Sequence, residues 1–242
     1  MGWLSLPFAG LDFETTGVDP ESDRVVSAAV VLRGGGRPTA RRSWLSDVGG
    51  AEIPAAATAV HGITTEHARA AGRPADEVVG EVAASVAEAV TAGWPLVVMN
   101  APFDLTMLDR ELRRYGLTPL VDRCNPYVLD PRVLDRKVSR RRGSRTLTDL
   151  ARHYVVPLYG AHSAEADALA ACAVTYKIAN RYRFLAETPL PRLHAEQARW
   201  AADQQAGLRD YFARTPGKEH QAAGVRLDWP MIPAPMATGS RL

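Results

Sequence analysis

The chain has 242 residues, of which 46% are hydrophobic and 23% are charged, and its formal net charge is +2. This composition is typical of a folded globular protein and excludes a chain that is disordered throughout. The net charge is too small to indicate a nucleic-acid partner by itself.

The two cysteines, Cys124 and Cys172, are too few for a disulfide framework, and neither lies in a CxxC pattern. This usage fits a reducing compartment. No apolar run approaches the roughly 20 residues that a membrane-spanning helix needs. The first residues also lack a basic segment followed by a long apolar one. We therefore expect a soluble protein of the cytoplasm, with no membrane partner.

Three segments near the start of the chain have the composition of β-strands. Residues 8–13 and 24–35 are rich in apolar and β-branched residues, and residues 37–47 alternate as an edge strand does. The short glycine-rich links between such runs indicate antiparallel hairpins. Residues 54–72 are expected to form a loop and a short helix.

The next segments alternate between helix and strand. Apolar spacing predicts helices over 75–93, 101–116, 146–156 and 163–182. Residues 95–100 have the apolar composition of a buried central strand, and residues 126–131 form a weaker strand. Thr146 and Asp149 have capping-box spacing, and Ser163 lies at or near a helix cap. This order of elements predicts an α/β fold.

Two acids end the first strand, in "LDFETTG". Side chains alternate between the faces of a strand, so Asp12 and Glu14 share a face while Phe13 lies on the opposite one. Carboxylates this close repel each other unless one of them is protonated or a cation lies between them.

Two later segments carry further acids. Asp104 begins the helix after the buried strand, in "NAPFD", and Asp167 follows His162 by five residues, in "HSAEADA". These side chains can converge at the open end of a sheet, where α/β proteins usually bind ligands. Four carboxylates and one histidine favour a hard cation such as Mg²⁺ or Mn²⁺, and the absence of cysteine ligands argues against structural Zn²⁺.

The three segments together resemble the motifs of the DEDDh group of 3′→5′ exonucleases, the family of the DNA polymerase III epsilon proofreading subunit. "VHGIT" at 60–64 resembles a further family segment, and the resemblance covers residues 6–182. It implies a ribonuclease H-like fold, in which helices flank a five-stranded mixed sheet. It also implies two divalent ions, held by Asp12, Glu14, Asp104 and Asp167.

The same resemblance assigns roles in hydrolysis. His162 would take the proton from the attacking water, and the product would be a nucleoside 5′-monophosphate released from a 3′ end. The backbone around Phe13, Thr15 and Thr16 would hold the terminal nucleotide, and His61 would contact it. Phe103 either faces the scissile region or belongs to the core.

Three functions are compatible with these residues. The leading hypothesis is a metal-dependent 3′→5′ exonuclease acting on single-stranded DNA in proofreading or repair. An exoribonuclease that trims RNA or oligoribonucleotides would use the same catalytic residues. A non-catalytic, polymerase-associated nucleic-acid-binding module would keep the fold alone, and the presence of all four acids and the histidine argues against it.

We expect residues 1–186 to form the exonuclease domain and 187–242 to form a C-terminal extension, a proline-bracketed helix followed by a Pro-rich irregular tail. "QAGLRDYF" (205–212) has the spacing of sliding-clamp-binding peptides but also that of a helix packed on the domain. A polymerase or a sliding clamp would be a separate chain. Trp200 and Trp229 are expected to anchor the extension.

A basic segment precedes the last two motif residues. Residues 132–145 hold seven basic residues and one acid. Its arginine run, 136–145, is compatible with a solvated loop and equally with contacts to the phosphates of an incoming strand.

Overall fold

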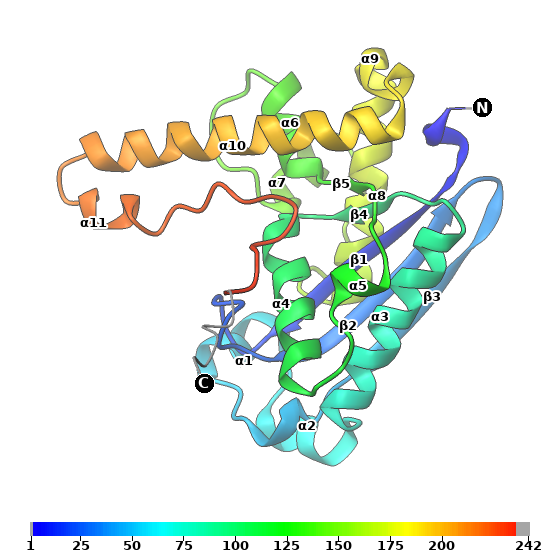
Figure 1. Ribbon diagram of the computed structural model, residues 1–242, viewed down its shortest axis with the longest axis vertical. Helices are drawn as coiled ribbons and strands as arrows, with labels where there is room; N and C mark the ends of the chain where they lie inside the picture. The colour runs from blue at the N-terminus through cyan, green and yellow to red at the C-terminus, as the bar shows by residue number, and fades with distance from the viewer. Residues whose placement is uncertain (1, 236–242) are drawn as a thin grey trace, which may run out of the picture.

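A five-stranded sheet forms the centre of the computed structural model, which describes residues 2–235 (Figure 1). The strands are β1 (Pro7–Thr15), β2 (Val25–Gly34), β3 (Arg37–Leu45), β4 (Leu96–Val98) and β5 (Val128–Leu129). Their order is β3-β2-β1-β4-β5, in which β2 is antiparallel to β1 and β3, and β4 is parallel to β1 and β5. The expected mixed sheet is confirmed, and β3 is an edge strand.

Helices cover both faces of the sheet. α3 (Ala75–Thr91) and α4 (Ala101–Arg114) lie on one face, and α8 (Ala164–Arg181) lies on the other (Figure 1). The other helices are α1 (Ala55–His61), α2 (Thr65–Ala71), α5 (Leu120–Arg123), α6 (Pro131–Val138), α7 (Leu147–His153), α9 (Arg183–Glu187), α10 (Leu190–Arg214) and α11 (Glu219–Ala222), with 3-10 turns η1 (Trp3–Ser5) and η2 (Val48–Gly50). None of the helices in the described part of the chain is long and apolar enough to cross a membrane.

Each face of the sheet has its own apolar core, because successive strand residues point to opposite faces. Phe8 of β1 packs in the core on the α8 face. Leu11 and Phe13, an odd number of residues away, pack in the core beneath α3 and α4. This alternation places Asp12 and Glu14 on the α8 face.

Two segments differ from the sequence-based expectation. Residues 54–72 form two helices rather than one, and Thr64 caps the second by accepting a hydrogen bond from the amide of His67 (3.1 Å). Helix α6 begins directly after β5, where the sequence predicted only a weak strand and a basic loop. The Asp130 carboxylate caps this helix by accepting from the amide of Arg132 (2.9 Å).

Part of the arginine run serves the fold. Asp135 is fully buried, and its Oδ2 accepts from Arg141 Nε (3.2 Å) and Arg145 Nε (2.7 Å), while its Oδ1 accepts from the Tyr154 hydroxyl (2.7 Å). These two arginines lie in the loop after α6 but bond the buried Asp135, so the interpretation of the run as solvated is wrong for them. Arg140 and Arg142 are exposed.

The C-terminal extension is bonded to the edge of the sheet. Gln197 of α10 donates from Nε2 to the carbonyl of Val128 (2.9 Å) and accepts at Oε1 from the amide of Asp130 (2.9 Å). Trp200 packs against the α8-face core, and Trp229 packs against the other core. The expected anchoring role of both tryptophans is confirmed. The boundary at residue 186 stays a prediction, and residues 236–242 of the Pro-rich tail lie outside the described residues.

Residues 228–235, which we call the C-terminal strap, run along α4 (Figure 1). The amide of Ile232 donates to Thr106 Oγ1 (2.9 Å), and Arg110 Nη2 donates to the carbonyls of Ile232 (3.1 Å) and Pro233 (3.0 Å). The same guanidinium donates to both carboxylate oxygens of Glu21, at 2.7 and 2.9 Å. One side chain thus joins α4, the strap and the loop that follows β1.

The segment with sliding-clamp-peptide spacing is helical. It lies within α10, whose end extends with α11 beyond the helices that cover the sheet (Figure 1). Tyr211 is 53% exposed, and its ring centroid lies 5.7 Å from that of Phe212. Binding of a clamp by this segment stays a prediction.

Candidate active site

Three of the predicted acids form one cluster. Asp12 and Glu14 come from the end of β1, and Asp167 comes from the first turn of α8. One carboxylate oxygen of each lies within 4.8 Å of the others. Segments more than 150 residues apart in the sequence therefore meet at one point.

Gly10 allows α8 to approach β1 closely. A Cβ atom at this position would lie 2.7 Å from Cys172 Sγ and 2.8 Å from the carbonyl oxygen of Ala168. Any larger residue would therefore push the helix outward. Because Asp167 directly precedes Ala168, this close packing also sets the distance between Asp167 and the acids of β1.

The electrostatics of the cluster favour a bound cation. Burial raises the pKa of Asp12 well above its ordinary value, and the charges of the other three acids add to the shift. Burial and the charge of Asp167 raise the pKa of Glu14 to about 7. Burial also raises the pKa of Asp167. Positive charge among these groups would stabilise their ionised forms.

Asp104 stands beside this cluster. It lies in the first turn of α4, is only 4% exposed, and is not among the three acids that approach within 4.8 Å. Burial raises its pKa, the backbone amides of Asp104 and Phe13 oppose the shift, and the charges of Asp130 and Glu14 add to it. The structure therefore brings Asp104 within electrostatic reach of the cluster.

His162 and Asp167 are linked through the backbone. The amide of His162 donates to Asp167 Oδ2 (3.3 Å), and His162 has a left-handed φ of 67°. The residue is exposed. Asp167 Oδ1 is buried and has no hydrogen-bond partner among residues 2–235. An unpaired carboxylate oxygen beside two other carboxylates fits a hard divalent cation.

The two threonines after the acids hold the turn that follows β1. Thr15 Oγ1 donates to the carbonyl of Gly17 (2.6 Å). Thr16 is 6% exposed, and its hydroxyl donates to Asp23 Oδ1 (2.8 Å) and accepts from the amide of Arg24 (2.9 Å). Both hydroxyls are therefore occupied within the turn, and the amide of Thr16 donates to the carbonyl of Arg24 (3.0 Å).

The remaining predicted contacts differ in their surroundings. Phe13 is 6% exposed and packs in the core on the face opposite the acids. Phe103 is half-buried and packs against the same core. His61 Nδ1 accepts from the amide of Ile63 (3.1 Å), and its ring lies beside the backbone of Thr15. Unlike Phe13 and Phe103, whose rings pack in the core, His61 therefore places its side chain next to the end of β1.

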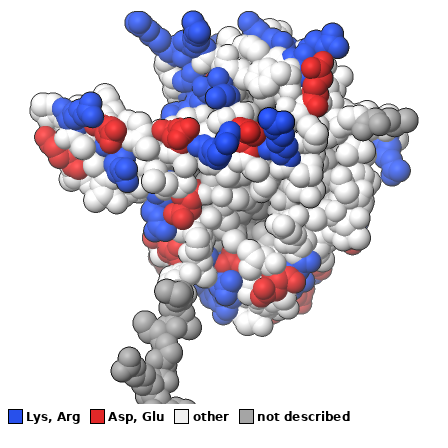
Figure 2. All heavy atoms as spheres, turned by 45° about the horizontal axis from the view of Figure 1, so that its top comes forward, with Lys and Arg blue, Asp and Glu red and all other residues white. Residues whose placement is uncertain are grey.

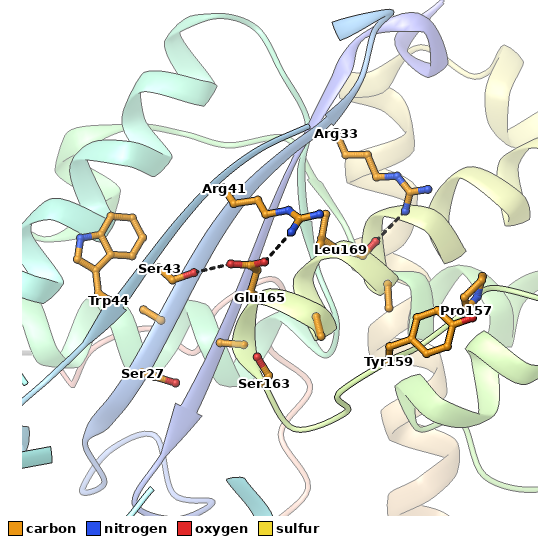
Figure 3. A pocket seen from close by; sticks show the side chains of 14 residues that line it. Ser27, Arg33, Arg41, Ser43, Trp44, Pro157, Tyr159, Ser163, Glu165 and Leu169 are labelled. Carbon is orange, nitrogen blue, oxygen red and sulfur yellow. Dashed lines mark hydrogen bonds and ion pairs between the residues drawn. The ribbon is translucent and has the colours of Figure 1, made fainter. Parts of the chain in front are cut away.

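A groove of about 670 Å³ lies beside the acids, between β2, β3 and the start of α8 (Figure 3). Ser27, which pairs with Glu14 across the strands, lies on its wall. Glu165 accepts from Arg41 (3.1 Å) and Ser43 (3.0 Å) across the groove. Sequence reasoning missed Ser27, Arg41 and Ser43 because they lie in strands that carry no motif. It gave no role to Glu165, although this residue lies within "HSAEADA".

The chain belongs to a family of exonucleases. The family model RNase_T, described as "Exonuclease", matches residues 10–175, which include every acid of the cluster and His162. The resemblance to the DEDDh group is confirmed.

Individual relatives agree with this assignment. Over 108 residues the chain is 44% identical to the "DNA polymerase III subunit epsilon-like protein" of Rhodobacter capsulatus, a match that covers 44% of this chain and 14% of that protein. The structure of exonuclease I of E. coli in complex with a dT13 oligonucleotide matches with a TM-score of 0.57 and 20% identity, covering 74% of this chain and 43% of that one. Exonuclease I of Methylocaldum szegediense matches with a TM-score of 0.60 and 20% identity, covering 74% and 42%.

These matches confirm the ribonuclease H-like fold, and at this identity they establish the fold alone. The chain spans less than half the length of each of these relatives.

Proposed function

We propose that this protein is a metal-dependent 3′→5′ exonuclease, which hydrolyses single-stranded DNA from its 3′ end and releases nucleoside 5′-monophosphates in a proofreading or repair role. The observation that carries the proposal is the cluster of Asp12, Glu14 and Asp167, whose carboxylate oxygens lie within 4.8 Å of one another. A partly buried acidic cluster of this kind destabilises the fold, so it is best explained by a ligand of positive charge.

The four acids would hold two divalent cations, Mg²⁺ or Mn²⁺. Asp12, Glu14 and Asp167 would bind one ion, and Asp12 would share the second with Asp104. When bound, such ions neutralise the phosphate and lower the pKa of water. The Asp167 oxygen that lacks a partner among the described residues is the atom we expect to point at the cation.

His162 would act as the general base. Imidazole is the side chain that most often accepts a proton in enzymatic hydrolysis. Its backbone bond to Asp167 holds the residue beside the acids, while its exposure leaves the ring accessible to water. The backbone of Phe13, Thr15 and Thr16, together with His61 and Phe103, would position the terminal nucleotide.

The relatives support DNA rather than RNA as the substrate. One is described as DNA polymerase III subunit epsilon-like, and another is in complex with an oligodeoxynucleotide. We place the protein in the cytoplasm, where a polymerase or a sliding clamp would be a separate partner chain.

The test is a 5′-labelled DNA strand incubated with Mg²⁺, Mn²⁺ or EDTA. A ladder that shortens from the 3′ end with either metal, and is absent in EDTA and in Asp12→Ala, supports the proposal. A single internal cut, or no cut, contradicts it. If a matched RNA strand is degraded faster than the DNA strand, the substrate is RNA and the protein is an exoribonuclease.

A further inference from the structure

A small polar pocket lies where the C-terminal extension meets the exonuclease domain. We call it the arginine pocket and define it by residues from four places, the residue before α4, helix α6, helix α10 and the strap: Asn100, Arg132, Arg136, Gln204, Gln205 and Trp229. The carboxylates of Asp130 and Asp228 also line it. Its volume is about 30 Å³. This is room for about two water-sized groups, which suits the two non-bridging oxygens of a phosphate and is too small for a base.

The acids near the pocket are already occupied. Asp130 accepts from the amides of Asn100 (3.2 Å), Ala101 (3.1 Å) and Arg132 (2.9 Å). Asp135 is saturated by two arginines and a tyrosine, as described above. Asp228, which also lines the pocket, pairs with Arg226 (3.1 Å). Within residues 2–235 none of them forms an ion pair with Arg132 or Arg136, although the charges of Asp135 and Asp130 act on Arg136 from a greater distance.

Those arginines lack an anionic partner. Arg132 Nη1 donates to the neutral amide oxygen of Asn100 (2.8 Å). Arg136 Nε is buried and has no hydrogen-bond partner among residues 2–235. Burial and the nearby charges of Arg132 and Arg145 lower the pKa of Arg136, and the charges of Asp135 and Asp130 only partly oppose this shift. An anion in the pocket would satisfy the buried donor and offset the repulsion.

The pocket lies next to the proposed active site. Asn100 is four residues before Asp104, at the start of the same helix. The charge of Asp130, which also lines the pocket, raises the pKa of Asp104, so the two carboxylates are close. A polynucleotide whose 3′ end reached the acids would have a phosphate within reach of this pocket.

Basic side chains continue outward from the pocket. Lys137, Arg140 and Arg142 are exposed on the end of α6 and the loop that follows it. Figure 2 shows Lys and Arg gathered on the upper part of the molecule, beyond the mixed charges along α10. A polyanion that left the pocket along this side would meet further positive charge.

We propose that the arginine pocket binds one backbone phosphate of the single-stranded substrate, close to its 3′ end on the 5′ side of the scissile bond. The inference rests on the proposed function, and it assigns the contact to Arg132 and Arg136, supported by the glutamines of α10. The C-terminal extension thus contributes directly to substrate binding.

The test uses 5′-fluorescent oligothymidylates, each with a single neutral methylphosphonate linkage at a different distance from the 3′ end. Binding is measured by anisotropy in Ca²⁺, after a gel has shown that the strand stays intact. We expect one neutral linkage near the 3′ end to weaken wild-type binding by about tenfold, the effect of losing one charge-assisted contact. Arg136→Gln should bind the unmodified strand about tenfold more weakly and should not respond to that linkage.

Salt dependence gives a second readout. Loss of one phosphate contact to a single strand should reduce the slope of log K against log salt by about 0.7 in Arg136→Gln. Arg37→Gln, which removes the same charge from an exposed position at the far end of the sheet, should retain the wild-type slope and linkage pattern. An equal response of Arg136→Gln and Arg37→Gln would overturn the proposal.

Gln205→Glu guards against a folding defect in Arg136→Gln. Gln205 makes no side-chain hydrogen bond among the described residues, so a charge there should leave the thermal unfolding midpoint unchanged. Gln205→Glu should weaken binding of the unmodified strand, and the neutral linkage that affects the wild type should have less effect on this variant. If Arg136→Gln and Gln205→Glu both respond to the neutral linkage as the wild type does, the inference is overturned. It is also overturned if inorganic phosphate competes with the strand but no neutral linkage weakens binding. Failure of the wild-type protein to bind or degrade any single strand would instead refute the proposed function.

Discussion

The histidine beside the acids has an unusual backbone that guides the choice of substitution. His162 has a φ of 67°, a region that asparagine tolerates better than most residues. His162→Asn should therefore keep the backbone bond to Asp167 while removing the imidazole. We expect kcat to fall by about 10²- to 10⁴-fold, the usual contribution of a general base.

Metal affinity distinguishes loss of the general base from displacement of the segment that carries His162 and Asp167, since both would lower kcat. Calorimetric titration with Mn²⁺ should give the same affinity for His162→Asn as for the wild type, because the carboxylates are untouched. Unchanged kcat in this variant would show that another group takes the proton.

In the metal-free protein, ionised Glu14 lowers the free energy of unfolding by a measurable amount. Its folded pKa of about 7 lies above the ordinary value of 4.5, so the folded state loses stability as pH rises from 4.5 to 7 and keeps the full penalty above that. The shift corresponds to roughly 3 kcal/mol. In EDTA at about pH 8, Glu14→Gln should raise the free energy of unfolding by up to this amount.

Urea unfolding with and without Mn²⁺ measures the effect. The wild type should gain more stability from the ion than Glu14→Gln does. Glu52→Gln, at an exposed acid, serves as the control and should change neither value. A metal-free Glu14→Gln protein no more stable than the wild type would contradict the electrostatic account.

The sequence predicted which acids belong to the site better than it predicted where each of them lies within it. Asp12 and Glu14 share a face because strand side chains alternate, and this needs no tertiary information. The exact place of Asp104 depends on how α4 packs. The sequence therefore predicted its participation but not that it stands outside the group of three.

At the scale of elements, the contact between β1 and α8 decides whether the acids meet. Gly10→Ala would place a Cβ within 2.9 Å of Cys172, Ala168 and Val31. Overpacking of this kind costs about 1–3 kcal/mol and displaces the helix that carries Asp167. We expect a lower unfolding midpoint together with weaker Mn²⁺ binding.

Gly80→Ala is the matched control. Gly80 lies within α3, and a Cβ there would meet only Leu117 Cδ1, at 3.6 Å. Alanine favours a helix over glycine by up to about 1 kcal/mol, so this variant should be as stable as the wild type or more so. Equal Mn²⁺ affinity in both glycine variants would show that the helix position does not control the cluster.

Helix α6 shows where element prediction from the sequence ended. The basic composition of this segment did not indicate a helix, and its start depends on Asp130. The same carboxylate accepts from the amide of Ala101, the first residue of α4 (3.1 Å). Arg141 and Arg145 lie in a loop, as their composition indicated, but the sequence did not show that the buried Asp135 is their partner. By contrast, the capping box of α7 at Thr146 is local and was predicted correctly.

At the scale of the whole molecule, Arg110 links the two ends of the fold. It is 7% exposed and bonds Asp109, Glu21 and the strap. Arg110→Ala leaves the fully buried Asp109 with fewer partners, so we expect a loss of about 3 kcal/mol in the free energy of unfolding. Arg113→Ala, which removes a 40% exposed partner of the same carboxylate, should cost less than about 1 kcal/mol.

Limited proteolysis adds a spatial readout. Arg110→Ala should be cleaved within the strap sooner than Arg113→Ala, because it loses two bonds to strap carbonyls. Equal cleavage rates would show that Trp229 and Thr106 hold the strap without the arginine. The sequence did not predict this link, since its partners lie more than 80 residues apart and carry no shared pattern.

The bond between Gln197 and β5 also bears on self-association. It occupies the carbonyl of Val128 and the amide of Asp130, so the backbone at that margin of the sheet cannot recruit a strand from a neighbouring molecule. In the described part of the chain this leaves β3 as the margin open to such pairing, and it carries Arg37, Arg41 and Arg42. Strand pairing at high concentration is therefore opposed by the arginines of β3 at one margin. At the other it is opposed by Gln197 together with His194, whose Nδ1 accepts from the amide of Val128 (3.0 Å).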